Sequence, residues 1–451
     1  MSKITSAATL MVVGLFLLGM VMVPLGTASA SDPVLKVGDR WGMGKEIDLG
    51  ANVTSKLSYI DNLLKSQANV TIDRLSVDSK VAYYVLFEIT GETATTYSIT
   101  AKMAFRFATS ANLKVTGGMP VAGTYGVYDN PFDPKSTVAK EAKTVSIDLE
   151  EKMGVVLTGT ATVEKTSMAI TNITWSFKGA LSVEIDAKNI PDINTTGSVQ
   201  IISYKDYDVG FEAVAGVDLY MDFTPALDLF QAPVVQGETW WTNETALTVA
   251  GSVNGHVNAH GLTDDIKAQI FTEELRNATG ATDFPISFEK LNSPDGEIKN
   301  GKFGPYNSTV EPIKMRCMNG LVTHTVNGEL KKYMKIQVND GATFLYSQDE
   351  GFLAGMYMNM GGSMPALPEE AGYVTALFGS QVSMDPMDAK VVSDKIKSID
   401  AYTAKLTSEV KGGGLIQDFF FKAPYLGFFF VALGAISIGI LAFFMTRPRK
   451  P

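Results

Sequence analysis

Short runs in which apolar and polar residues alternate with a period of two fill most of the chain between Pro33 and Pro368. Residues 144–149 alternate strictly, and β-branched residues are common in these runs. Successive side chains of a strand point to opposite faces of its sheet, so this period is typical of half-buried strands. Asn327–Gly328 has the composition of a hairpin turn. The pattern predicts antiparallel sheets, each with one apolar face that must be covered. Further runs of this kind are 81–89, 154–163, 180–186, 247–259 and 334–338, and 263–277 is the best candidate for a helix among them.

An internal repeat indicates that the strands come in two tandem units. Residues 37–41 read Val-Gly-Asp-Arg-Trp, and residues 236–240 read Gln-Gly-Glu-Thr-Trp. Each motif opens a long alternating stretch, and Pro-Ala-Leu closes both stretches. The fold that we expect is mainly β, with two tandem antiparallel β-sheet units produced by internal duplication. The units span residues 31–230 and 231–370, and an amphipathic heptad-patterned helix and one C-terminal transmembrane helix follow them.

An apolar seam within residues 371–411 predicts the membrane-proximal helix. Its members recur at spacings of three and four over three heptads, with Thr403 as the polar exception. One interpretation is a coiled-coil stalk that self-associates above the membrane. The other, which we favour, is a single amphipathic helix packed on the β units. The apolar seam residues are Ala389, Val392, Ile396, Ile399, Leu406 and Val410.

Both ends of the chain indicate export and membrane anchoring. Residues 1–30 have the positive start, the apolar stretch and the small-residue cleavage site of a signal peptide, with an uncleaved anchor as the competing interpretation. Residues 424–445 carry no charge and are long enough for a bilayer span of about 20 residues. Residues 412–423 form a Gly-rich joint and an interfacial segment, and the basic tail at 446–451 favours a cytoplasmic C-terminus. We therefore expect a single-pass protein whose N-terminal ectodomain lies at the cell surface.

Composition restricts what the ectodomain binds and what stabilises it. The formal net charge of -10 argues against nucleic acid as a partner, because phosphate binding needs a basic face. The single cysteine, Cys317, cannot form an internal disulfide, so the sheets must rely on burial. A set of Asn-x-Ser/Thr sequons lies between the two apolar ends and predicts glycosylation, with an Asn- and Thr-rich β surface as the alternative. The sequon asparagines are Asn52, Asn69, Asn172, Asn194, Asn243, Asn277 and Asn307.

The residue types that usually carry catalysis or bind metals do not form a recognisable signature. His256 and His260 are four residues apart, but on a strand that separation is about 13 Å, too far for one ion. His324 fits the surface of another strand. Cys317 follows Arg316, which would activate the thiol if the side chains met, but a buried small hydrophobe is the commoner role. We therefore predict no enzyme activity, no catalytic residues, no cofactor and no metal.

An apolar wall is the one ligand-binding surface that the sequence suggests. Met356, Met358 and Met360 share one face if they lie on a strand. Thioethers are soft ligands for Cu(I), but such side chains more often line a core or an adaptable apolar wall. Aromatic and Met-rich segments in both units supply the predicted wall, which consists of Phe211, Tyr220, Met221, Phe352, Met356, Met358 and Met360.

The order of these segments resembles archaeal type I cell-surface glycoproteins, including the membrane anchors of surface layers. The resemblance covers the architecture of the whole chain and includes no family motif, so no functional residue is transferred. It implies a non-enzymatic, membrane-anchored cell-surface glycoprotein with an envelope-structural or interaction role, with other envelope proteins as partners. The alternative is a carrier or binding protein for a lipid or another apolar ligand held by the curved β-sheets. An extracellular hydrolase ranks third, because carboxylates are many but nothing selects a pair.

Overall fold

The computed structural model describes residues 35–48, 70–126, 137–196, 198–229, 234–262, 264–293, 296–338, 342–347, 352–359 and 381–409. Their strands form one large antiparallel sheet, which confirms the expectation of a mainly β fold. No helix among these residues is long and apolar enough to cross a membrane. The segments expected at 1–30, 412–423, 424–445 and 446–451 lie outside the described residues.

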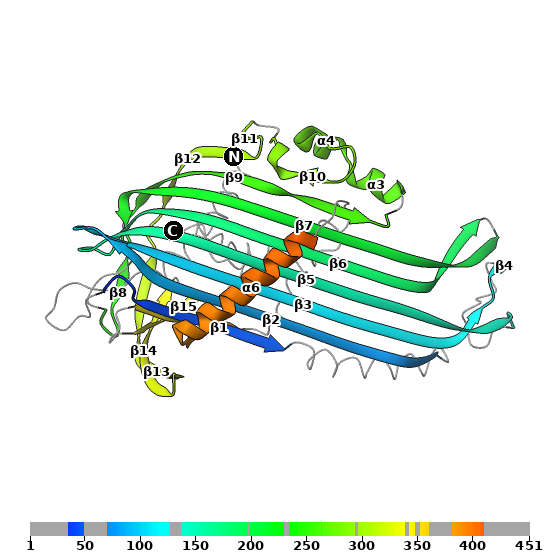
Figure 1. Cartoon of the computed structure of the whole chain (residues 1–451), viewed down its shortest axis with the longest axis horizontal. Helices are drawn as coiled ribbons and strands as arrows, with labels where there is room; N and C mark the ends of the chain where they lie inside the picture. The colour runs from blue at the N-terminus through cyan, green and yellow to red at the C-terminus, as the bar shows by residue number, and fades with distance from the viewer. Residues whose placement is uncertain are drawn as a thin grey trace, which may run out of the picture.

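Two meanders with the same strand order make up most of the sheet (Figure 1). Within each meander, every strand pairs with the next one in the order given. The first contains β1 (Arg40–Asp48), β2 (Val70–Glu92), β3 (Thr96–Pro120), β5 (Lys140–Glu164), β6 (Ile170–Thr196) and β7 (Val199–Leu227). The second contains β8 (Thr239–Trp241), β13 (Lys314–Val326), β14 (Glu329–Val338), β15 (Ala342–Ser347), β16 (Phe352–Asn359) and β17 (Gln381–Met387).

The two meanders join edge to edge. β17 pairs with β1, and β7 pairs with β9 (Thr245–His260), which follows β8 directly in the chain. The expectation of two separate β-sheet units is therefore wrong: the strands form one sheet, because edge strands satisfy their free backbone groups by pairing. The remaining elements are β4 (Gly123–Gly126), β10 (Ile286–Ser287), β11 (Ile298–Lys299), β12 (Lys302–Val310), α3 (Asp264–Ile270), α4 (Glu273–Thr279), the 3₁₀ helix η1 (Phe288–Lys290) and α6 (Ala389–Glu409).

The repeated Gly-containing motifs form the same turn at the start of each meander. The amide of Gly38 donates to Ile89 O, and the amide of Gly237 donates to Cys317 O, both at 2.8 Å. Both glycines have positive φ, 97° and 87°, which favours glycine over other residues. The second meander also extends past the expected boundary at residue 370, since β17 lies inside the segment assigned to the helix.

The strands of the first meander are much longer than the alternating runs suggested. β5 has 25 residues and extends about 80 Å, whereas β14 has 10. The runs expected at 144–149 and 154–163 are parts of this one strand. Gly154 separates them in the sequence without breaking the strand; a Cβ there would lie 2.3 Å from Thr403 Oγ1 of α6. The glycine therefore permits close helix packing rather than a turn.

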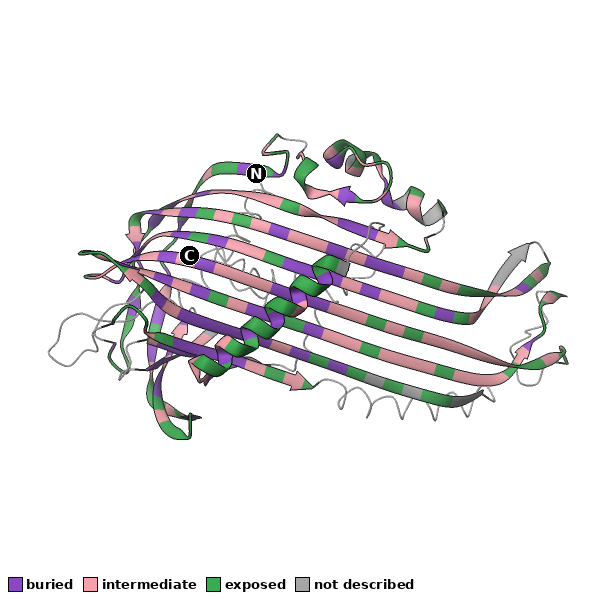
Figure 2. Cartoon of the chain, viewed as in Figure 1, coloured by how far each residue is buried: buried purple, intermediate pink, exposed green. Residues whose placement is uncertain are grey.

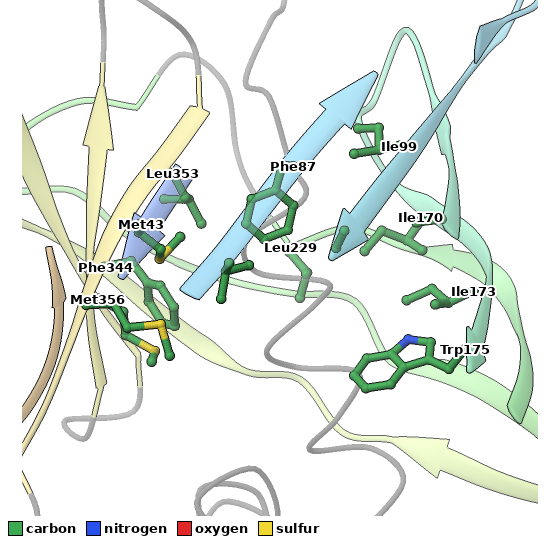
Figure 3. Close-up of a cluster of buried hydrophobic side chains, with 14 of the residues drawn as sticks. Met43, Phe87, Ile99, Ile170, Ile173, Trp175, Leu229, Phe344, Leu353 and Met356 are labelled. Carbon is green, nitrogen blue, oxygen red and sulfur yellow. The ribbon is translucent and has the colours of Figure 1, made fainter. Parts of the chain in front are cut away.

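The inner face of the curved sheet, defined here as the face on which the two meanders meet, holds the main hydrophobic core. Trp41 stacks between Phe87 and Phe352, with ring centroids 5.5 and 4.7 Å away. Figure 3 shows Phe344 and Met356 of the second meander across from side chains of the first. This cluster consists of buried side chains from both meanders, and it contains the free Cys317.

The outer face carries α6, which crosses β1, β2, β3, β5 and β6 diagonally (Figure 1). Val392, Ile396 and Ile399 form a buried cluster with side chains of β2 and β3. Asp388 caps the helix, since its Oδ1 accepts from Val391 N at 2.9 Å. Ala389 is half-buried, Leu406 is buried and Val410 lies outside the described residues. The seam predicted for self-association is therefore used within the chain.

Replacing Ile396 by alanine tests how strongly α6 is held on the sheet. Ile396 is only 5% exposed, so Ile396→Ala should lower the free energy of unfolding by about 2–4 kcal/mol. The matched control, Lys397→Ala, alters a neighbouring exposed side chain and should change it by less than about 0.5 kcal/mol. Chemical denaturation measures both values. Equal effects of the two substitutions would contradict the packing of α6 on the outer face.

Candidate functional site

Beyond the core, the long strands continue with the same alternation of faces. Val81, Phe107, Met153, Val183 and Phe211 are the last large apolar side chains buried on the inner face, and the small side chain of Ala187 is buried farther out. Figure 1 shows β2 to β7 extending well past β13 to β15, and Figure 2 shows that buried residues become sparse toward their far ends. We call the apolar part of the inner face beyond this boundary the distal face. Its residues are Ala111, Leu113, Val115, Val145, Ile147, Leu149, Ile185, Ala187, Tyr207 and Val209.

The distal face is arranged in cross-strand rows. Leu149 pairs with Ala111 on one side and with Ile185 on the other, and Ile185 pairs with Val209. All four of these side chains are half-buried. Their neighbours along each strand, such as Asp148, point to the outer face and are polar. The sheet here is therefore apolar on one face and polar on the other.

A single carboxyl lies on the inner face where the core ends and the distal face begins. Glu151 pairs with Thr109 and with Val183, and Thr109 Oγ1 lies 2.8 Å from the buried Ser79 Oγ. Burial raises the pKa of Glu151 from its ordinary value of 4.5 to about 7. The boundary between core and distal face thus offers hydroxyl groups and a carboxyl that is easily protonated.

Most of the described residues of the predicted apolar wall lie in the hydrophobic core rather than on the distal face. Phe211, Met221 and Met356 are buried in the shared core, and Phe352 packs against it. Tyr220 was misassigned, because it lies on the outer face and its hydroxyl donates to Asp222 Oδ2 at 2.8 Å. Adjacent residues of a strand cannot face the same way, so Tyr220 and Met221 cannot share a wall. The side chains of Met358 and Met360 lie outside the described residues.

The histidines and the cysteine occupy different environments. His324 Nε2 lies 2.6 Å from the hydroxyl of Tyr357. Burial raises the pKa of the Cys317 thiol, and the charge of Glu238 raises it further. The hypothesis that Arg316 activates this thiol is therefore wrong. His256 and His260 share the outer face of β9.

His260 meets carboxylates from neighbouring strands. Its Nε2 lies 3.5 Å from Asp208 Oδ1 and 3.6 Å from Glu184 Oε2. Among the described residues, these three form a group able to hold a metal ion. The spacing of His256 and His260 could not predict this group, because the carboxylates come from β6 and β7. Only the strand register brings them together.

The sequon asparagines differ in exposure. Asn277 and Asn307 are exposed. Asn172 and Asn243 are half-buried, and Asn243 donates from Nδ2 to Ala226 O and accepts at Oδ1 from Asp228 N. Asn52, Asn69 and the side chain of Asn194 lie outside the described residues.

Comparison with models of known protein families, with curated protein sequences and with solved structures finds no match to this chain. Its function must therefore be inferred from the two faces of the sheet. The inner distal face offers half-exposed apolar rows, and the outer face offers charged groups.

Glu151 should make the stability of the fold depend on pH. The folded protein retains this proton up to pH about 7, whereas an ordinary Glu loses it near 4.5, so the folded state binds more protons in that window. Stability is therefore greatest below the window and falls as the pH rises through it. Glu151→Gln should remove this loss, which amounts to at most about 3.5 kcal/mol at roughly 1.4 kcal/mol per pH unit.

Chemical denaturation at several pH values measures the effect. Glu150→Gln is the matched control, because Glu150 is exposed on the outer face. The control should retain the wild-type pH dependence between about 4.5 and 7. Parallel stability curves for wild type and Glu151→Gln would contradict the assignment.

Proposed function

We propose that the protein is a non-enzymatic, membrane-anchored cell-surface glycoprotein whose extracellular β-sheet binds lipid acyl chains along the distal face. The observation that carries the proposal is the set of half-exposed apolar rows on the inner face of the long strands. An apolar surface of this kind gains free energy by leaving water. We interpret the two meanders as the products of an internal duplication. Together they form the curved sheet on which we propose that the lipid is held.

The dimensions of the distal face suit an extended apolar ligand. Leu113 and Leu149 belong to adjacent rows, and rows on one face of a strand are about 7 Å apart. A lipid chain lying across the rows would gain about 0.8 kcal/mol for each CH₂ that it buries. Burial of half a dozen methylenes would therefore contribute roughly 5 kcal/mol before the entropic cost of binding.

The polar groups at the boundary suit the headgroup end of such a ligand. Ser79 and Thr109 carry hydroxyls, and Glu151 can donate a hydrogen bond when protonated. A lipid whose chain lies on the distal face would bring its ester, ether or hydroxyl oxygens near this row. The boundary would then fix the orientation of the ligand, while the apolar rows supply the affinity.

The anchoring and glycosylation parts of the proposal come from the sequence. The apolar segments at 1–30 and 424–445 support export and a single C-terminal span. The exposure of Asn277 and Asn307 supports sugar attachment at these two positions. An anchored protein would meet lipid at the surface of its own membrane.

An envelope-structural or interaction role is the second candidate. The polar outer face and the two exposed sequon asparagines favour it, since both suit contact with other envelope proteins. The apolar seam of α6 packs against the sheet, so self-association would have to use another surface. A binding partner on the outer face and a lipid on the inner face are distinguishable by experiment.

Photocrosslinking tests the lipid proposal on the full-length chain. Benzoylphenylalanine replaces Leu149 on the inner face or, as the matched control, Asp148 on the outer face. The protein is reconstituted in phosphatidylcholine vesicles, and adducts are identified by mass spectrometry. We expect lipid adducts at position 149 and few at position 148. Equal lipid labelling at both positions, or none at 149, would refute the proposal, and protein adducts at 148 from native membranes would favour the second candidate.

A double substitution gives the matching loss of binding. Leu149→Glu with Ile185→Glu places charges in one cross-strand row of the distal face. It should reduce lipid recovered with the purified chain by at least about tenfold, because an unpaired charge disfavours an apolar contact. Asp148→Glu with Asp186→Glu is the control on the outer face, where acidic residues already stand.

A further inference from the structure

A small cluster of two acidic residues and one histidine lies on the outer face where β6, β7 and β9 run side by side. Glu184 and His260 both pair with Gly210 from opposite sides, and Asp208 precedes Gly210 by one pleat on the same face. A Cβ at Gly210 would lie 2.1 Å from His260 Cε1 and 2.6 Å from Glu184 Oε2. Any other residue at position 210 would push the two side chains apart. Glycine therefore allows donor atoms from three strands to converge.

The two distances from His260 to the carboxylates are close to the ligand spacing of a tetrahedral zinc site. His260 Nε2 lies 3.5 Å from Asp208 Oδ1 and 3.6 Å from Glu184 Oε2. Ligands that bind zinc tetrahedrally at about 2.0–2.1 Å are separated by roughly 3.3–3.4 Å, the edge of that tetrahedron. An imidazole is a poor ligand for Ca²⁺ or Mg²⁺, which prefer oxygen. The donor set therefore favours a divalent transition metal.

The surroundings of Glu184 would also favour a bound cation. The carboxylates of Glu212, Asp208 and Glu150 repel the charge of Glu184. A divalent cation among these carboxylates would relieve the repulsion.

Asn258 is a buried amide near His260 on β9. It lies one pleat before His260 on the same face of β9, and it pairs with Glu212. Its side chain is 0% exposed, and neither Oδ1 nor Nδ2 has a hydrogen-bond partner in the described part of the chain. A buried amide without partners costs free energy, so such a group in a native fold needs an explanation. An ordered water would supply the missing partner of this amide.

We propose that Glu184 Oε2, Asp208 Oδ1 and His260 Nε2 bind a divalent transition-metal ion of the zinc class. The three ligands leave a fourth position for solvent, since all three side chains are partly exposed. The ion links β6, β7 and β9, and so joins the first meander to the strand that follows β8. This site lies on the opposite face from the distal face and does not depend on lipid binding.

Isothermal titration of the purified full-length chain with ZnCl₂ tests the site. We expect one Zn²⁺ per chain, and at least about tenfold weaker binding for His260→Asn and for Glu184→Gln. His256→Asn is the matched control, because His256 lies on the same face of the same strand. Its affinity should equal that of the wild type. Circular dichroism without zinc establishes that all variants remain folded.

The spectrum of bound Co²⁺ provides a second readout. Co²⁺ at the site should give the intense ligand-field absorption of a four-coordinate ion, and His260→Asn should abolish it. The proposal is overturned if the wild type binds no Zn²⁺, which would leave His260 as an ion-pair partner only. It is also overturned if His256→Asn weakens binding as much as His260→Asn, or if Ca²⁺ displaces Zn²⁺ at equal concentration.

Discussion

Backbone hydrogen bonds between strands of about two dozen residues hold β2 to β7 in a register that shifts at a few positions. Since side chains alternate strictly along each strand, this register decides which residues reach the inner face over the whole length of the sheet. The core, the distal face and the charged group around His260 all follow from it. Pairing between β17 and β1 extends the ladder into the second meander and brings the two apolar faces together.

Helix α6 covers apolar side chains on the outer face of the sheet. The strands beneath it carry apolar side chains such as Tyr84 and Leu86 on that face, which would otherwise meet water. The helix covers them along a diagonal, and Gly42 and Gly154 let it approach closely, because a Cβ at either position would collide with Val392 or Thr403. The ion pair between Lys395 and Glu46 at 2.6 Å adds a polar contact at its flank. One helix thus covers the apolar part of the outer face.

The alternating pattern was sufficient to predict the strands, their amphipathic faces and the turn at Asn327–Gly328, because these depend on neighbours in the sequence. It could not give the length of β5, since Gly154 looks like a turn residue until α6 is placed above it. The Val145, Ile147 and Leu149 signal for the distal face was present, but its exposure depends on where the second meander ends. The group around His260 was beyond reach, because its carboxylates come from β6 and β7 and meet the histidine only through pairing across Gly210.

The pairing register of the first meander constrains how such a sheet can change in evolution. Inserting one residue in the middle of β5 would exchange the faces of every residue between the insertion and the distal end of the strand. Ile147 would turn outward and Asp148 inward. A bulge could absorb the insertion locally, as one does between Ala187 and Ile190 near the far end of β6. Elsewhere the strands could lengthen only by two residues at a time, with matching additions on their neighbours. Homologous sheets should therefore differ in reach by whole cross-strand rows.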